Sequence, residues 1–256
     1  MTDVERTSPV SGSGLVFTVG LNGYAERYER YVASQRSFAE RNGYQYLVVT
    51  EPSGSYGASE AAWLKIAVIN DALRAGFERV VFFDCDAEVL ETAPPVAAAM
   101  DVEPQAHIYL VRGHSGRFNS GVVMVRNGEP AQMFFKEIWA RMGTPLSQAD
   151  DVGWGENGHV IQLSKEVSCI AELPRSWNNT RLPPPDPEYV RHHTGPIRAE
   201  ENRQRAEATG EDTVSRPHPL AGRLTTSLDD SVALIAGAGK LAAEYSPSVP
   251  TPRQGR

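Results

Sequence analysis

Cysteine, positive charge and long apolar runs are all scarce in this chain of 256 residues. The 2 cysteines, Cys85 and Cys169, are too few for a disulfide scaffold or a four-cysteine zinc site. The 25 Lys and Arg residues against 32 Asp and Glu residues leave a formal net charge of -7, which argues against general binding of nucleic acid. No apolar run approaches the roughly 18 residues that span a bilayer, so we expect no membrane span.

The N-terminal segment lacks the basic and apolar regions of a secretory signal. Residues 1–14 are polar and include Asp3 and Glu5. With so few cysteines, this composition predicts a cytoplasmic location, and we expect residues 1–13 to be disordered. Apolar residues make up 41% of the chain and charged residues 22%, so the composition is that of an ordinary globular protein with a sizeable core.

Apolar runs and amphipathic stretches alternate along the first two thirds of the chain. Strands are expected at residues 15–20, 45–50, 79–83, 107–111 and 120–125. Helices are expected at residues 24–41, from a cap at Ser59 to Gly76, at 129–142 and at 155–164. The alternation predicts an α/β fold with a mostly parallel central sheet flanked by helices. Ligands of such sheets bind outside the carboxyl ends of the strands.

The C-terminal part of the chain differs in composition from the rest. Residues 199–212 are charged and contain few large apolar side chains, which predicts a solvated or mobile segment. A helix is expected within residues 228–245, and the proline-containing tail at 246–256 is expected to be disordered. We therefore predict a catalytic domain over residues 14–197 and an appendage over 198–256.

Two carboxylates, Asp84 and Asp86, directly follow the apolar run at 79–83. At a spacing of two residues both side chains leave an extended backbone on the same side, at the edge where ligands bind. Two anions this close repel each other unless a cation lies beside them, and carboxylate oxygens suit Mg²⁺ or Mn²⁺ that also binds phosphate. On this pattern alone, the residues form either a metal site for a diphosphate or a solvated turn.

Five further residues are candidates whose position alone does not decide their role. Lys65, on the helix before the Asp84 strand, suits either a phosphate contact or a solvated helix face. His192 and His193 end a short extended segment and suit either metal binding or an ordinary surface. Glu156 and Asn157 begin a predicted helix, where acidic residues are also favoured by the helix dipole.

Six segments in series carry a family resemblance. In chain order they are WLK at 63–65, DCD at 84–86, NSGVVMVRN at 119–127, WARMG at 139–143, ENGHVIQL at 156–163 and YVRHHTG at 189–195. Their order and spacing resemble the retaining glycosyltransferases that include plant xyloglucan xylosyltransferases and fungal α-galactosyl- and α-mannosyltransferases. The resemblance covers residues 14–196 and favours the metal-site interpretation of the two aspartates.

This resemblance implies a GT-A type fold that binds a nucleotide-diphospho-sugar. Asp84, Asp86 and His192 would hold Mn²⁺ or Mg²⁺ against the diphosphate of the donor, which is most often a UDP-sugar in such enzymes. Lys65 matches a lysine near the diphosphate or the donor sugar. Gly195 matches the glycine that closes the family's histidine motif, and we expect it to border the donor.

Other matches concern the donor sugar. Asn119, Ser120 and Gly121 match the stretch that lies beneath this sugar in the family. Gly20 and Asn22 follow the first predicted strand, at its carboxyl end, and are further candidates for donor binding.

The resemblance also identifies candidate catalytic residues. Glu156 and Asn157 stand where the family has Asp-Gln, and together with Lys65 they are expected to act at the reacting sugar. Asp150 and Asp151 offer a second alignment of the same acidic motif.

The predicted activity is metal-dependent transfer of a hexosyl or pentosyl group, with retention, from a nucleotide sugar to an acceptor hydroxyl. The acceptor would be a small molecule or a saccharide. One alternative is a phosphatase of the haloacid-dehalogenase type, in which Asp84 would attack phosphate and Asp86 would act as acid and base. That motif usually has Thr or Val where this chain has Glu88. The other alternative is a sugar-nucleotide binding module without activity, because Glu156 and Asn157 depart from the family's pair.

Overall fold

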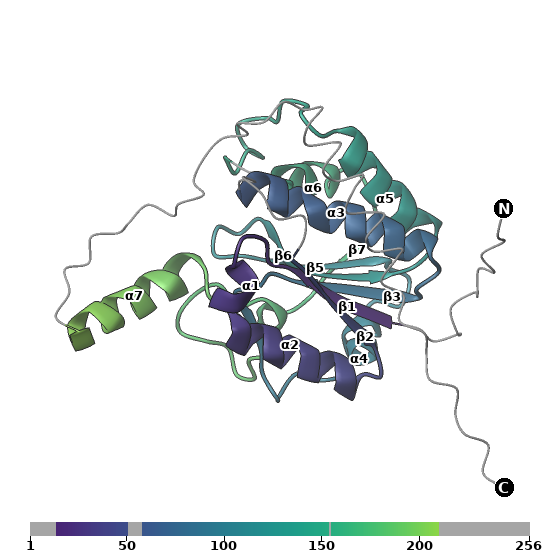
Figure 1. The fold of residues 1–256 in the computed structure, drawn as a ribbon. Helices are drawn as coiled ribbons and strands as arrows, with labels where there is room; N and C mark the ends of the chain where they lie inside the picture. The colour runs from purple at the N-terminus through teal and green to yellow at the C-terminus, as the bar shows by residue number, and fades with distance from the viewer. Residues whose placement is uncertain (1–13, 51–57, 154, 210–256) are drawn as a thin grey trace, which may run out of the picture.

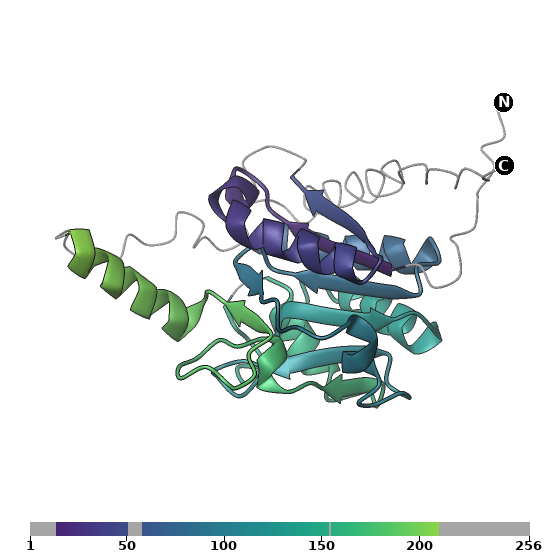
Figure 2. The same ribbon diagram turned by 90° about the horizontal axis from the view of Figure 1, so that it is seen from below.

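The computed structural model of the protein describes residues 14–50, 58–153 and 155–209. A six-stranded central sheet has helices on both of its faces (Figures 1 and 2). In sheet order the strands are β2 (Gln45–Val49), β1 (Gly14–Val19), β3 (Arg79–Phe83), β6 (Phe118–Arg126), β5 (Ile108–Arg112) and β7 (Ile170–Glu172). This arrangement confirms the predicted α/β class.

Only β6 runs opposite to its neighbours in this sheet, because it pairs antiparallel with both β3 and β5. The link from Arg112 to Phe118 is too short for a crossover helix, so β5 and β6 must form a hairpin. The other neighbouring pairs are parallel, which confirms the mostly parallel sheet. The strand β7 and a helix at Val96–Met100 were not expected from the sequence.

The helices divide between the two faces of the sheet (Figure 1). One face carries α3 (Ala58–Arg74), α5 (Glu129–Ala140) and α6 (Asn157–Leu163), and the other carries α1 (Tyr24–Arg27), α2 (Glu29–Arg41) and α4 (Val96–Met100). The predicted helix at 24–41 is two helices, because Tyr28 between them has non-helical angles of φ -111° and ψ 24°. Ser59 lies inside the first turn of α3 and is not its cap, which corrects that prediction.

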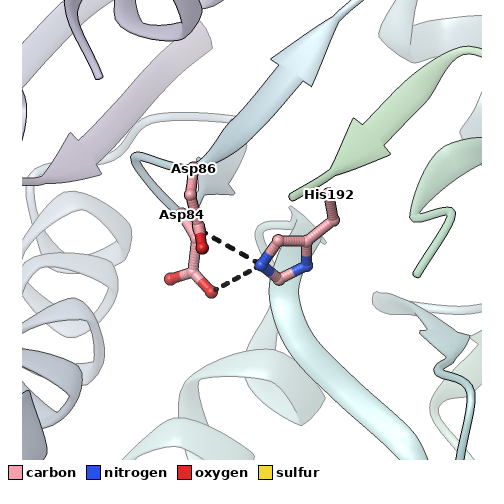
Figure 3. A group of neighbouring side chains, drawn as sticks. All are labelled: Asp84, Asp86 and His192. Carbon is pink, nitrogen blue, oxygen red and sulfur yellow. Dashed lines mark ion pairs between the residues drawn. The ribbon is translucent and has the colours of Figure 1, made fainter. Parts of the chain in front are cut away.

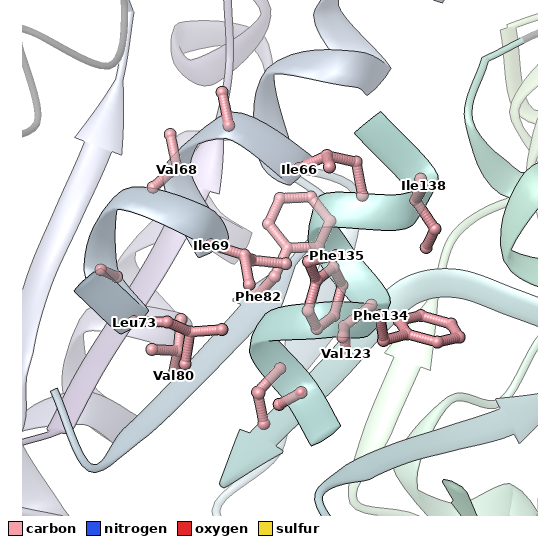
Figure 4. Packing of buried hydrophobic residues seen from close by; sticks show 14 of the residues in the cluster. Ile66, Val68, Ile69, Leu73, Val80, Phe82, Val123, Phe134, Phe135 and Ile138 are labelled. Atoms are coloured by element: carbon pink, nitrogen blue, oxygen red, sulfur yellow. The ribbon is translucent and has the colours of Figure 1, made fainter. Parts of the chain in front are cut away.

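The core lies on both faces of the sheet because alternate strand residues point in opposite directions. On β3, Val80 and Phe82 face α3 and α5, whereas Val81 and Phe83 face α2 and α4. The packing between α3 and α5 is built from large apolar side chains (Figure 4), among them Ile66, Ile69, Leu73, Phe134, Phe135 and Ile138. This core fixes the position of β3 and therefore of the residues that follow it.

A second sheet of two short strands joins distant parts of the chain. β4 (Ala87–Val89) pairs antiparallel with β8 (Val190–His192), and Ala87 lies opposite His192. β8 confirms the short extended segment expected near residue 190, whereas β4 was not expected. The pairing places the residues after β3 beside the end of β8.

The helix α7 (Gly195–Thr209) projects from the rest of the protein (Figure 1). The sequence predicted a solvated or mobile segment at residues 199–212, and residues 199–209 form a helix with no buried side chain among residues 199–208. On this helix Arg203 forms ion pairs with Glu200 and Glu207, three and four residues away, which stabilise an exposed helix with few apolar residues.

Several predictions fall outside the described ranges. They are the disordered segment at 1–13, the helix within 228–245 and the tail at 246–256, and the domain boundary near residue 197 also stays a prediction. No helix in the described part of the chain is long and apolar enough to cross a membrane.

Candidate functional site

The side chains of Asp84, Asp86 and His192 meet beyond the carboxyl end of β3 (Figure 3). One ligand atom of each lies within 4.8 Å of the others. His192 Nε2 is 3.5 Å from Asp84 Oδ2 and 3.2 Å from Asp86 Oδ1. The structure therefore brings together the three residues that the sequence proposed as metal ligands, and we call them the metal-ligand cluster.

A tight turn, not an extended strand, brings the two carboxylates together. The Ala87 N–H donates to the Asp84 carbonyl at 2.9 Å, which closes a turn directly after β3. The buried Gln35 amide donates to the carbonyls of Asp84 and Ala87, each at 2.8 Å. The expectation of an extended backbone was wrong in geometry, although the two side chains do converge.

A hydrogen bond to Asn178 orients the ring of His192. His192 Nδ1 lies 3.0 Å from Asn178 Oδ1, and the Asn178 amide donates to Asn119 Oδ1 at 2.9 Å. Because that amide group is the donor towards Asn119, its oxygen accepts from Nδ1–H. His192 therefore turns Nε2 towards the carboxylates, which is the usual orientation of a metal-binding histidine.

Gly121 is required where the cluster packs against β6. A Cβ atom at this position would lie 2.2 Å from His192 Cε1 and 2.7 Å from Asp84 Oδ2, so any larger residue would displace the cluster. The Asp84 N–H also donates to the Gly121 carbonyl at 2.8 Å. The glycine that the sequence matched to the donor-sugar stretch therefore shapes the metal-ligand cluster.

Burial and neighbouring charges act against each other in this cluster. Burial raises the pKa of Asp84 above its usual value, although Lys65 opposes the change. Burial also acts to raise the pKa of Asp86, but His192 and then Arg198 outweigh it and lower that pKa. For His192, burial acts to lower the pKa, and the two carboxylates outweigh it and raise it. Without a metal, the two carboxylates therefore favour the protonated form of the imidazole.

The donor set of the cluster fits a divalent cation. It offers two carboxylate groups, which suit Mg²⁺ and Mn²⁺, and one imidazole nitrogen, a common ligand of transition metals. A bound cation would take over the balancing charge that the proton on His192 otherwise supplies. The cluster is thus a possible divalent-metal site.

Lys65 is a buried cation beside the cluster. Its side chain, on α3, is 5% exposed, and Nζ lies 2.8 Å from Glu156 Oε1 and 3.7 Å from Asp84 Oδ1. Nζ also donates to the Ser120 carbonyl at 3.1 Å. Burial acts to lower the pKa of Lys65, but Asp84 and Glu156 outweigh it and raise the pKa. Lys65 is therefore a fixed positive charge next to the metal ligands.

Glu156 and Asn157 form a layer beneath this lysine. The Glu156 side chain is 2% exposed and accepts a 2.5 Å hydrogen bond from Ser120 Oγ. Asn157 Oδ1 accepts from the Ser120 N–H at 2.9 Å, and its amide donates to the Phe118 carbonyl at 3.3 Å. Glu156 thus contacts Lys65, and both residues contact β6. The pair therefore holds Lys65 and β6 in position beside the cluster.

The alternative acidic pair lies elsewhere. Asp150 forms an ion pair with Lys165 and accepts a 2.9 Å hydrogen bond from Ser147 Oγ. Asp151 Oδ1 accepts from the Gly153 N–H at 2.7 Å, within its own loop. Of the two alignments, the structure places Glu156 next to the cluster.

The remaining donor-binding candidates are placed differently from one another. Gly20 is buried, and a Cβ there would lie 2.6 Å from Ala25 Cβ and 2.7 Å from Cys85 Sγ, so this glycine serves packing. Asn22 is exposed and has a left-handed backbone with φ 55°. Asn119 uses Oδ1 to accept from the Gly121 N–H at 3.0 Å. Gly195, with φ +49°, begins α7 next to the ring of His114.

Sequence reasoning missed Arg198, Gln35 and Asn178. Arg198 forms an ion pair with Asp86 and donates to the His193 carbonyl at 2.8 Å. A cation three residues after Gly195 was a visible signal, whereas nothing in the local pattern marks Gln35 or Asn178.

His193 has a structural role that its position left open. Its Nε2 lies 3.2 Å from Glu88 Oε2 and its Nδ1 lies 2.5 Å from Glu201 Oε1 on α7. Its ring stacks on Tyr31 with centroids 4.2 Å apart. His193 therefore attaches α7 to α2 and β4.

Comparison with known proteins supports the fold. No protein-family model matches the sequence, and no curated protein matches it. A glycosyltransferase involved in the glycosylation of the major capsid of PBCV-1 has a similar structure, with a TM-score of 0.57 and 15% identity, and the match covers 75% of this chain and 98% of that one. The glycosyltransferase GlyE of Streptococcus pneumoniae TIGR4 matches with a TM-score of 0.47 and 13% identity over 71% of this chain and 54% of its own. The first likeness shows a glycosyltransferase fold, which confirms the GT-A type fold expected from the sequence.

Proposed function

We propose that this protein is a metal-dependent glycosyltransferase that uses a nucleotide-diphospho-sugar, most simply a UDP-sugar. The observation that carries the proposal is the meeting of Asp84, Asp86 and His192 at the carboxyl edge of a sheet with a glycosyltransferase fold. Ligands bind at that edge in α/β proteins of this kind. The cytoplasmic location expected from the sequence stays a prediction.

In this proposal Asp84, Asp86 and His192 hold Mn²⁺ or Mg²⁺. The metal, when bound, neutralises the negative charge of the departing diphosphate. Lys65 adds a second positive charge beside Asp84, and Glu156 holds it there. Because the side chain of Glu156 is 2% exposed and already accepts from Ser120, its position favours supporting Lys65 over removing a proton from the acceptor.

The residues Asn119, Ser120 and Gly121 lie where the donor sugar would rest. In the transfer, the bond between the anomeric carbon and the phosphate oxygen breaks with both electrons going to that oxygen. The acceptor hydroxyl forms the new bond to the anomeric carbon, and its proton passes to the departing phosphate oxygen. Attack from the face of the leaving group retains the anomeric configuration, and no protein base is needed.

The two alternative functions make different predictions. A phosphatase of the haloacid-dehalogenase type needs Asp84 as a free nucleophile, whereas Asp84 here shares His192 with Asp86 and lies near Lys65. That arrangement favours metal binding, and labelling of Asp84 by a phosphoryl donor would support the phosphatase. A binding module would bind a nucleotide sugar without ever transferring or hydrolysing it.

The test is a thermal-unfolding panel of nucleoside diphosphates, with and without Mn²⁺. A ligand at 100 times its dissociation constant stabilises the folded state by about 2.7 kcal/mol, so UDP should raise the melting temperature only together with Mn²⁺. Asp86→Asn should abolish this shift, and Asp101→Asn, an exposed aspartate away from the cluster, should keep it. Equal shifts with and without Mn²⁺ would contradict a metal-dependent site.

Activity completes the test. Nucleotide sugars that stabilise the protein are then incubated with Mn²⁺, and the released nucleoside diphosphate is measured. Asp86→Asn should lower the rate by about 10²-fold to 10³-fold, the loss expected when a group that stabilises the leaving charge is removed. Binding without release of nucleoside diphosphate, with or without acceptors, would leave the binding module as the better description.

A further inference from the structure

A groove with three cationic side chains lies beside the proposed donor site. Its cavity volume is about 320 Å³, and we call it the Arg117 groove. Its lining includes Arg112, Arg117, Phe118, Asp150, Ile161 and Lys165. The lining therefore carries more positive than negative charge, in a protein whose formal net charge is -7. A cationic cleft on an acidic protein concentrates anions locally.

The three cationic side chains differ in whether a carboxylate forms an ion pair with them. Arg112 pairs with Glu172 at 2.8 Å, and Lys165 pairs with Asp150. Arg117 Nη1 instead donates to two backbone carbonyls, those of Ala149 at 3.1 Å and Asp151 at 3.4 Å. Within the described ranges, no carboxylate forms an ion pair with Arg117. Its guanidinium is held in place by these carbonyls. Its charge acts on Asp150 at a distance, since the pKa of that carboxyl is lowered first by Lys165 and to a smaller extent by Arg117.

An aromatic ring forms part of the same groove. Phe118 lies under the guanidinium of Arg112, whose central carbon is 4.5 Å from the ring centroid. An apolar ring beside fixed charges is the usual lining of a small-ligand site, where the ring provides contact area and the polar groups give orientation. Arg guanidinium groups bind carboxylate and phosphate through paired hydrogen bonds.

The groove is joined to the proposed donor site through β6. Phe118 lines the groove, and two residues later Ser120 contacts Lys65 and Glu156. Residues two apart on a strand point to the same side and are separated by about 7 Å. Asn157 connects these two residues, because its side chain donates to the Phe118 carbonyl and accepts from the Ser120 N–H. A ligand in the groove therefore lies next to the position of the donor sugar.

We infer that the Arg117 groove is the acceptor subsite and that it selects a saccharide bearing a carboxylate or phosphate group. This inference rests on the proposed function. Arg117 binds the anionic group, Phe118 packs against a sugar ring, and the hydroxyl that receives the sugar points along β6 towards Asp84. Lys165 adds charge at the rim, where its side chain is 57% exposed.

Calorimetric titration without nucleotide or metal tests the groove by itself. The probes are glucose 6-phosphate and glucuronate, with glucose as the neutral match and inorganic phosphate as the match without a sugar. Both charged sugars should bind at least tenfold more tightly than glucose, and glucose 6-phosphate more tightly than inorganic phosphate. Equal binding of glucose and the charged sugars, or of inorganic phosphate and glucose 6-phosphate, would overturn the inference.

Substitution locates the binding. Arg117→Gln should weaken both charged sugars at least tenfold, and Arg117→Lys should restore part of the loss because a point charge remains. Arg74→Gln, the same change at an exposed arginine on α3, should alter the affinity by less than twofold. An unchanged affinity in Arg117→Gln, or an equal loss in Arg74→Gln, would show that the anion binds elsewhere.

The comparison of charged sugars distinguishes the sources of the anionic group. Tighter binding of glucuronate indicates a uronic-acid acceptor, and tighter binding of glucose 6-phosphate indicates a sugar-phosphate acceptor. A separate titration of the wild-type protein with UDP and Mn²⁺ tests the donor site. If the protein binds the charged sugars but not UDP with Mn²⁺, the proposed function is rejected. If it binds UDP with Mn²⁺ but not the charged sugars, only the acceptor subsite is rejected.

Discussion

The metal-ligand cluster and the Arg117 groove lie at the same end of the sheet but hold their charges in opposite ways. Asp86 and His192 are 5% and 3% exposed, and each of them has an oppositely charged partner. In the groove, Arg112 and Lys165 are about half exposed, and within the described part of the chain the Arg117 guanidinium donates to backbone carbonyls alone. The cluster is thus a network closed by paired charges, in which Asp84 reaches solvent with 34% of its side chain exposed. The groove is open to solvent.

This difference predicts which substitutions affect folding and which affect only binding. Removing one charge from a closed network leaves its partner buried and unpaired, which strongly destabilises the folded state. Removing a charge from an open groove leaves carbonyls that water can reach. Effects on stability should therefore concentrate around Lys65, and effects on acceptor affinity around Arg117.

The largest expected effect on stability is that of Lys65→Met. It leaves the carboxylate of Glu156 buried without its 2.8 Å partner, at a cost of about 3–5 kcal/mol in unfolding free energy. Denaturant unfolding measures the loss. The double variant Lys65→Met with Glu156→Gln should be more stable than Lys65→Met alone, and Lys136→Met on the exposed face of α5 should stay within about 0.5 kcal/mol of wild type. A double variant less stable than the single one would contradict a closed network.

Gly121→Ala should damage metal binding more than folding. Its Cβ would push against the ring of His192, so Mn²⁺ affinity should fall about 10-fold to 100-fold, as when an outer contact of a metal ligand is lost. The control is Gly128→Ala, whose Cβ would lie 2.4 Å from the ring of His107, away from the cluster. Both variants should lose about 1–3 kcal/mol from overpacking. Equal Mn²⁺ affinities in the two would show that the position of His192 does not matter.

The two regions should also respond differently to pH. The carboxylates raise the pKa of His192 above its usual 6.5, so in metal-free protein its contribution to stability is complete below that pH. This contribution is lost as pH rises through the raised pKa, because the folded state then gives up the proton. Thermal unfolding in a chelator should show this loss in wild type and not in His192→Gln. In general, a guanidinium group stays charged at any pH that a folded protein tolerates.

The smallest expected effect on stability is that of Arg117→Gln. The carbonyls of Ala149 and Asp151 can bond water after the change, so unfolding free energy should fall by less than about 1 kcal/mol. Denaturant unfolding checks this alongside the sugar titrations. A loss as large as that of Lys65→Met would mean that the groove is part of the structural core.

The sequence predicted the features of the fold that depend on local residue patterns. The apolar run before Asp84 identified β3, and the alternation of helices and strands identified the sheet. The convergence of Asp84, Asp86 and His192 was also anticipated, although through a family pattern and with the wrong backbone geometry. The antiparallel direction of β6 was not anticipated. An apolar run predicts where a strand lies but not its direction, which here follows from the short link between β5 and β6.

The rest depends on contacts between distant residues. Gln35 supports the turn after Asp84 from 49 positions away, and Asn178 orients His192 from a loop with no motif. Whether Glu156 faces the donor or lies beneath Lys65 is decided by the packing of α6 on β6. The Arg117 groove combines the hairpin at Arg112 with the end of α6, so no single segment indicates it.

The pairing of β4 with β8 has a consequence for how the protein matures. Two of the three proposed metal ligands are present once residue 86 has been synthesised, but the third arrives more than 100 residues later and is positioned only when Ala87 pairs with His192. A nascent or truncated chain that stops before β8 lacks that ligand. In the proposed function, capture of the ion therefore reports that β8 has docked, and activity requires synthesis of the chain at least through His192.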